Sequence, residues 1–196
     1  MAISYYKGKY GRTFTPGQGL PVVSTELDSV RNYQFEVQFK GLPGDITNSD
    51  DLTLAAKRVQ GLSMTNEPIT VNRVNDKLYY PGKSTPGELQ IEFDNLYLRE
   101  TSSDLWKFFK HTYDPITGEI SKRSLPGGDQ PGFKVNTIEI IQLDNSITPH
   151  SVIEVYGAFA TSWTASEFNY ATSEFHTITV NFRYDFMNTF NYSNPD

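Results

Sequence analysis

The sequence predicts a mainly β domain, an antiparallel β-sandwich or partly closed barrel of about seven strands with one short helix. Two observations favour strands. Phe, Tyr and Trp make up 14% of the 196 residues, and aromatic side chains are enriched in strands and at interfaces. Several short segments alternate apolar and polar residues with a period of two, as half-buried strands do. A third observation limits the helices, because only one segment shows a clear helical period.

The first strand is expected over 33–39, where apolar and polar residues alternate and turn residues follow. Residues 52–60 are expected to form a second strand of mixed pattern. A hairpin is expected from 69 to 80, with its turn at Asn75-Asp76. Residues 81–87, rich in Pro and Gly, are expected to close it.

The next strand is the cleanest in the middle of the chain, because Leu89, Ile91 and Phe93 alternate with polar residues. A helix is expected to follow, starting near residues 100–104 with a Thr or Ser cap. Its apolar stripe contains Leu105, Phe108, Phe109 and Thr112, and Pro115 ends it. We expect this stripe to pack in the core and the outer face of the helix to be available to a partner.

Three strands are expected in the C-terminal part, over 133–143, 152–160 and 177–185, after a long connection at 114–133. The last one places five apolar residues on one side: Ile178, Val180, Phe182, Tyr184 and Phe186. The expected organisation is therefore an N-terminal arm at 1–30, a β domain at 31–190 and a C-terminal tail at 191–196.

The arm shows no apolar period and is interrupted by Gly and Pro. It nevertheless contains four aromatic residues, Tyr5, Tyr6, Tyr10 and Phe14. One interpretation is an unstructured tail. The other is an extension that becomes ordered against a neighbouring subunit, which would explain the aromatic rings.

Composition excludes several classes of function. The chain has no cysteine, so disulfides, thiolate zinc sites and cysteine catalysis are excluded. Its net charge is −6, which argues against binding nucleic acid through phosphates. No apolar run approaches the roughly 20 residues of a bilayer span, and the N-terminus does not resemble a signal peptide. We therefore expect a soluble, cytoplasmic chain without a membrane anchor.

No catalytic, metal-binding or cofactor-binding set is found. His111, His150 and His176 are far apart in sequence and lack metal-ligand spacing. Gly82-Lys83-Ser84 resembles the end of a phosphate-binding loop, but the required earlier glycine is replaced by Lys77. Asp50-Asp51 is expected to be solvated. The sequence therefore predicts no enzyme and no cofactor, and the aromatic residues and polar strand faces favour an assembly protein.

The order of elements over about 31–190 resembles the tail tube proteins of contractile-tailed bacteriophages. The segments that carry the resemblance are 32–37, 59–63, 71–82, 89–93, 105–109, 155–164 and 178–185. Among them are Leu105-Trp106-Lys107-Phe108-Phe109 and Ile178-Thr179-Val180-Asn181-Phe182. The fold is also similar to that of the tube protein of type VI secretion systems.

The resemblance implies a virion protein, made in the cytoplasm of a bacterial host. It implies homo-hexameric rings that stack into a hollow tube inside a contractile sheath, with sheath, baseplate and terminator proteins as partners. DNA would pass through the lumen without specific binding, which the acidic balance of the chain favours. Closing the edges of a sheet around a ring also removes an aggregation hazard.

Ring-to-ring contacts are expected in extended segments. The candidates are the arm and the 66–87 hairpin region, with these residues: Tyr5, Tyr6, Tyr10, Phe14, Asn75, Asp76, Lys77, Tyr79, Tyr80 and Lys83. An ordinary surface turn is the simpler interpretation of the hairpin. Alternatives for the whole chain are a tail terminator, a baseplate hub or a secretion tube of the same fold. A small-ligand-binding β-barrel of lipocalin type is a further alternative.

Overall fold

The computed structural model of the chain describes residues 6–7, 13–14, 31–42, 46, 49–120, 132–144, 147–171 and 173–192. The chain divides into two units, Met1–Arg31 and Asn32–Asp196. In the first unit, β1 (Tyr6–Lys7) pairs antiparallel with β2 (Thr13–Phe14), so part of the arm forms a short ladder.

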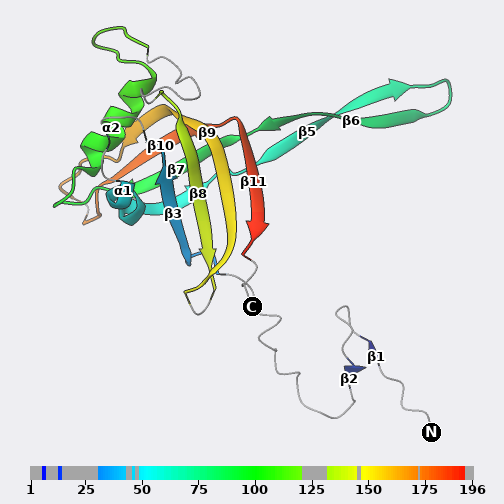
Figure 1. The fold of residues 1–196 in the computed structure, drawn as a ribbon, viewed down its shortest axis with the longest axis horizontal. Coiled ribbons are helices and arrows are strands. Elements are labelled where there is room, and N and C mark those ends of the chain that lie inside the picture. Colours follow the sequence, from blue (N-terminus) through cyan, green and yellow to red (C-terminus); the bar gives the residue numbers. More distant parts are fainter. Residues whose placement is uncertain are drawn as a thin grey trace. The chain divides into compact units, whose positions relative to one another are not determined.

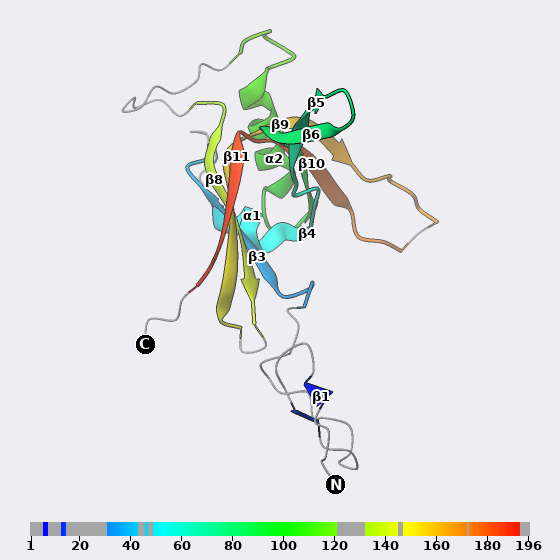
Figure 2. The same ribbon diagram turned by 90° about the vertical axis from the view of Figure 1, so that its right-hand side faces the viewer.

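The second unit is built on one antiparallel sheet that curls without closing (Figures 1 and 2). Its strand order is β3 (Phe35–Lys40), β8 (Val135–Leu143), β9 (Pro149–Ala165), β10 (Thr177–Arg183), β7 (Glu88–Asp94) and β4 (Ala56–Gln60), and β11 (Phe186–Asn191) also pairs with β9. The predicted fold class, a mainly β sandwich or partly closed barrel, is confirmed.

The long strand β9 connects the two halves of the curled sheet. Its first part pairs with β8 and β11, and its last part pairs with β10. Between these parts, Gly157 has φ of +66°, a conformation that side chains other than glycine rarely adopt. A Cβ there would also lie 2.3 Å from the Asp185 carboxylate. Glycine thus permits the backbone conformation at the point where β9 passes from one half to the other.

The core fills the space between the two halves of the sheet. The alternating residues of β3, β7 and β10 are buried, as their sequence period predicts. The Phe39 ring of β3 meets the Phe93 ring of β7 with centroids 6.1 Å apart, although these strands are not neighbours in the sheet. The interior is therefore packed with side chains where a ligand-binding barrel would need a cavity.

The predicted helix is confirmed as α2 (Thr101–Thr112), and its Leu105 and Phe108 are fully buried. Phe108 packs on Phe182 of β10 with ring centroids 5.4 Å apart. The expected Thr or Ser cap is wrong. Glu100 occupies the N-cap position and makes no side-chain capping hydrogen bond, while Thr101 lies inside the helix and is buried.

The expected strand at 52–60 is wrong in its first half. Residues Ser49–Ala55 form a second helix, α1, and only β4 (Ala56–Gln60) is a strand. α1 packs against β3 and β7 on the open side of the curled sheet. The expectation that both acids are solvated is also wrong, because Asp51 is buried and pairs with Arg99 at 2.9 Å between Oδ1 and Nη1.

A long hairpin leaves the sheet between β4 and β7 (Figure 1). It consists of β5 (Met64–Asn72) and β6 (Lys77–Pro86), which pair antiparallel. The expected turn is confirmed, with Arg73 N–H donating to Asp76 O at 2.8 Å. The expectation that 81–87 would close the hairpin is wrong, since β6 continues to Pro86 and the ladder of β4 and β7 extends into that of β5 and β6.

The root of this β5–β6 hairpin is held by backbone geometry and one buried hydroxyl. Gly87 N–H donates to Ser63 O at 2.9 Å. The Tyr184 hydroxyl donates to the same oxygen at 2.7 Å and accepts from Ser63 N–H at 3.3 Å. At Gly61, φ is +85° and an added Cβ would lie 2.1 Å from Glu88 O, so only glycine fits. The hairpin thus leaves the domain from a defined root.

The three predicted C-terminal strands are present with different bounds, because β8 and β10 are two residues shorter than predicted and β9 is longer. β9 begins at Pro149 and ends at Ala165, and a further strand, β11, follows β10 after a bend. Phe186 was expected on the core side of the preceding strand, but it begins β11 and is 52% exposed. Of the expected C-terminal tail, Asn191 belongs to β11, and residues 193–196 lie outside the described residues, as do 121–131 of the long connection.

Within the described residues, no helix is long and apolar enough to cross a membrane.

We predict that Ile91→Ala lowers the free energy of unfolding by about 2–5 kcal/mol, because it opens a cavity in a fully buried position. The matched control is Ile69→Ala on the hairpin, where the side chain is 56% exposed and the change should stay within about 0.5 kcal/mol. Denaturant unfolding followed by circular dichroism measures both. Equal losses at the two positions would show that the hairpin belongs to the core.

We also predict that Tyr184→Phe lowers the free energy of unfolding by about 1 kcal/mol, because the backbone N–H and carbonyl oxygen of Ser63 lose their hydroxyl partner. The amides at the hairpin root should then exchange faster with deuterium. Tyr156→Phe is the control, since its hydroxyl donates only to the surface carboxylate of Glu154 and a smaller change is expected. Unchanged exchange at the root in Tyr184→Phe would contradict this account of how the hairpin is anchored.

Candidate assembly surfaces

The β5–β6 hairpin has two chemically different faces, and both are open. Cross-strand pairing places Ile69 opposite Tyr80 and Val71 opposite Leu78, so these four share one apolar face. The other face is more polar. Every residue of β5 is exposed, including Ile69 and Val71. On β6, Tyr80 is exposed and Leu78 is half-buried. A two-stranded hairpin is marginally stable alone, and an apolar face of this kind is typical of a contact surface.

The six hairpin residues that the sequence singled out all lie on this element. Asn75 and Asp76 are in its turn, and the other four are in β6: Lys77, Tyr79, Tyr80 and Lys83. The structure places all six at exposed positions of one projecting element. Their role in contacts between subunits stays a prediction.

Of the four aromatic residues of the arm, Tyr5 and Tyr10 lie outside the described residues. Tyr6 and Phe14 are directly opposite each other in the β1–β2 ladder. Their proposed contacts likewise stay a prediction.

Three strands of the curled sheet pair on one side only, namely β3, β4 and β11. α1 packs against β3. β11 is the most exposed of the three, and its residues Phe186 and Phe190 are large and apolar. Unpaired strand edges are templates for pairing with another chain.

A cleft of about 730 Å³ lies between the segment after β9 and the strands β4 and β7. We call it the acidic cleft. It is lined by Lys57, Glu92, and residues 166–170 and 173–177. The loop that forms it is closed at its base, where Thr177 N–H donates to Ser166 Oγ at 3.0 Å and Ser166 N–H donates to Thr177 O at 2.9 Å.

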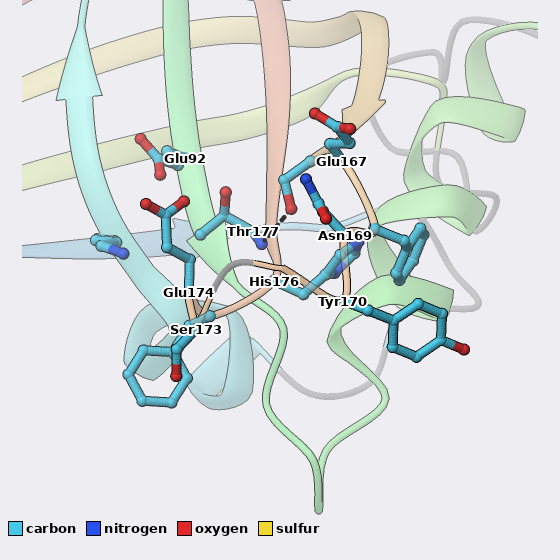
Figure 3. A pocket seen from close by; sticks show the side chains of 12 residues that line it. Glu92, Glu167, Asn169, Tyr170, Ser173, Glu174, His176 and Thr177 are labelled. Atoms are coloured by element: carbon cyan, nitrogen blue, oxygen red, sulfur yellow. Dashed lines mark hydrogen bonds between the residues drawn. The ribbon is translucent and has the colours of Figure 1, made fainter.

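Carboxylates and aromatic rings gather around the acidic cleft. Figure 3 shows Glu92 and Glu174 on one side and Tyr170 on the other. Phe168 stacks on the His176 ring with centroids 4.4 Å apart. Sequence reasoning missed this site, because the 166–176 segment has no period. Its only signal is the three aromatic residues in a polar stretch, Phe168, Tyr170 and Phe175.

The described residues do not form a recognisable catalytic arrangement. The three histidines lie in different elements: His111 in α2, His150 in β9 and His176 before β10. Across the described part of the chain, no group of three metal-binding side chains comes together.

Shifted pKa values occur away from the acidic cleft. The hydrogen bond that Lys40 donates to Glu139 raises the pKa of Lys40. The backbone N–H of Ile116 lowers the pKa of Asp114, and the hydrogen bond to Glu154 raises the pKa of the Tyr156 hydroxyl. Each shift follows from a hydrogen bond between neighbouring groups.

Comparison with known proteins identifies the fold. A chain of the PVC sheath–tube complex, an extracellular contractile injection system in its extended state, has a TM-score of 0.62 and 16% identity, covering 87% of this chain and 99% of that one. A chain of the anti-feeding prophage baseplate has a TM-score of 0.62 and 17% identity, covering 83% and 96%. A chain of the tube-terminating cap of that prophage has a TM-score of 0.62 and 14% identity, covering 87% and 99%.

At these identities the likeness shows the fold alone. No curated protein matches the sequence.

The family comparison goes further than the fold. The model of the family described as T4-like virus tail tube protein gp19 matches residues 31–188, which include both helices, the β5–β6 hairpin and the curled sheet up to the first half of β11. This confirms the resemblance seen in the sequence. The family is one of structural tube proteins and not of enzymes. The chain belongs to the T4-like virus tail tube protein gp19 family.

Proposed function

We propose that this chain is the subunit of a tail tube, in which six copies close into a ring and rings stack into a hollow conduit for DNA inside a contractile sheath. The observation that supports this most directly is the β5–β6 hairpin, which leaves the domain with an uncovered apolar face. A second copy would cover that face. The family to which the chain belongs supplies the same expectation.

The one-sided strands support the closure of a ring. β4 and β11 have unpaired edges, and a head-to-tail contact between two different edges closes into a ring when the rotation permits. In such a ring each copy would use one edge on each side. Sixfold closure is the part of this proposal that comes from the family rather than from the edges.

The charge of the chain supports a conduit. With a net charge of −6 per copy, a ring is acidic overall. DNA carries one negative charge for about every 1.7 Å of its axis, so basic walls would hold it and acidic walls would let it move. The outward side chains of β10 are neutral and polar over Thr179 and Asn181, as a non-binding wall requires.

The two units of the chain would have separate tasks in the tube. The domain forms the ring, and the arm at 1–30 contributes to stacking between rings. Sheath, baseplate and terminator proteins would be the partners of the assembled tube, and the particle would be a phage tail made in a bacterial cytoplasm. A terminator or baseplate hub of the same fold would form single rings, which electron microscopy distinguishes from cylinders.

We predict that replacing Tyr79 and Tyr80 by serine abolishes long cylinders while the subunit stays folded, because both rings are exposed on the hairpin and would be buried only on stacking. Negative-stain microscopy and sedimentation measure assembly, and circular dichroism measures folding. The matched control replaces Tyr97 and Tyr113, two exposed tyrosines outside the hairpin. Normal cylinders from the hairpin variant would remove the hairpin from the stacking contact.

Deletion of residues 1–28 should weaken stacking and leave the domain folded. The buried core cluster of the described residues lies entirely in the second unit, so the deletion removes none of it. Cylinder length at equal protein concentration is the measurement, with circular dichroism as the control for folding. If the shortened chain grows cylinders of normal length, the arm has no part in stacking.

A further inference from the structure

We propose that the acidic cleft binds the basic N-terminal segment, residues 1–20, of a second copy of the chain. This inference rests on the proposed function in one respect only, that copies of the chain assemble with one another. It assigns a specific receptor and a specific ligand segment to a contact between them.

Three carboxylates line the cleft, those of Glu92, Glu167 and Glu174. Within the described part of the chain, no cation lies within ion-pair distance of Glu92, Glu167 or Glu174. The cleft contains one lysine, Lys57, but its Nζ pairs with Asp94 Oδ1 at 3.2 Å. Glu92 lies directly opposite Arg58 in the β4–β7 ladder, whereas the charges of Glu167 and Glu174 are not matched by a cation of the described residues. The cleft therefore favours a cationic ligand.

Aromatic rings surround these carboxylates. Phe168, Tyr170 and Phe175 are almost completely exposed, and they belong to one loop of the cleft. Aromatic faces attract lysine and arginine cations, and they stack on other rings. Three exposed rings beside the carboxylates of Glu167 and Glu174 fit a ligand that carries both cations and aromatic side chains.

The first 20 residues of the chain have this composition. They hold three of the 17 basic residues, Lys7, Lys9 and Arg12, and none of the 23 acidic residues. They also hold four aromatic residues, which alternate closely with the cations. The remainder of the chain is therefore more acidic than the whole, and segment and cleft have opposite charge.

The hairpin of a second copy fits the cleft less well. It is also basic at Arg73, Lys77 and Lys83, but Glu67 and Asp76 offset two of these charges. The segment 1–20 also lies outside the family match, which begins at residue 31. A contact made by it would therefore be an addition of this chain to the tube contacts that the family shares.

Each copy has one such segment and one such cleft. In the interior of a head-to-tail assembly, every segment can therefore occupy the cleft of a neighbouring copy. Individual exposed ion pairs contribute little. Several cations and rings of one short segment bind together, so their combined contact stabilises the docked segment. This contact weakens as the salt concentration rises.

The absence of cysteine allows a direct test in the full chain. The variant Lys9→Cys with Ser173→Cys places one thiol in the segment and one at an exposed position of the cleft. Under mild oxidation of the concentrated chain, whether or not cylinders are present, we expect disulfide-linked multimers on a non-reducing gel. The matched control, Lys9→Cys with Ser103→Cys, has its second thiol at an exposed position of α2 and should give at least five-fold less product.

Charge reversal provides the second part of the test. In the cysteine variant, Glu167→Lys with Glu174→Lys should reduce cross-linking at least five-fold, and so should Lys7→Glu with Arg12→Glu. Combining the two reversals should restore it, since the opposite charges are present again. A loss that the combination does not restore would overturn the charge-based docking.

Other outcomes also decide the question. A disulfide within one chain, without an increase in mass, would overturn docking between copies. Cross-linking of Asn75→Cys with Ser173→Cys in place of the Lys9 product would identify the hairpin as the occupant and overturn the inference. Normal cylinders without the Lys9 product would also overturn it but leave the proposed function standing, whereas a chain that never forms rings or cylinders would contradict the proposed function itself.

Discussion

The hydrogen-bonded ladder of β4 and β7 fixes where the core ends and where the hairpin leaves it. Inside the domain, β7 is covered by the core, with Leu89, Ile91 and Phe93 fully buried. The same two strands then continue past Ser63 and Gly87 as the β5–β6 hairpin, where no core covers them. The hydrogen bond from Gly87 N–H to Ser63 O joins this ladder to the separate two-stranded sheet of β5 and β6, and so couples the buried core to an exposed hairpin.

Three kinds of incomplete surface follow from this arrangement: the apolar face of the hairpin, the unpaired strand edges and the acidic cleft. Each of these surfaces fits a contact with another copy of the chain better than it fits a catalytic site. The edges offer backbone hydrogen bonds, the hairpin offers apolar area, and the cleft offers charge. Together they would provide both closure around a ring and stacking along an axis, with the Tyr184 hydroxyl setting the root from which the hairpin leaves.

The sequence predicted best the strands that have one buried face. In β3, β7 and β10 the alternation is strict because one side meets the core and the other does not. It failed at Ser49–Ala55, where Leu52 and Ala55 are buried but Leu54 is 70% exposed, a pattern too short to separate a helix from a strand. β11 and the root half of β6, residues 81–86, were missed because no core imposes a period on them. The acidic cleft was missed because it depends on a loop meeting distant strands.

We infer that identical copies complete the exposed edges and the hairpin of this domain around a central bore. Cryo-electron microscopy of the concentrated, pure chain would show whether they do. We expect hollow cylinders of stacked rings, in which β4 or β11 of one copy is hydrogen-bonded to its neighbour and the β5–β6 hairpin is covered by another copy. Particles that remain single subunits at high concentration, with free edges and no bore, would contradict the claim.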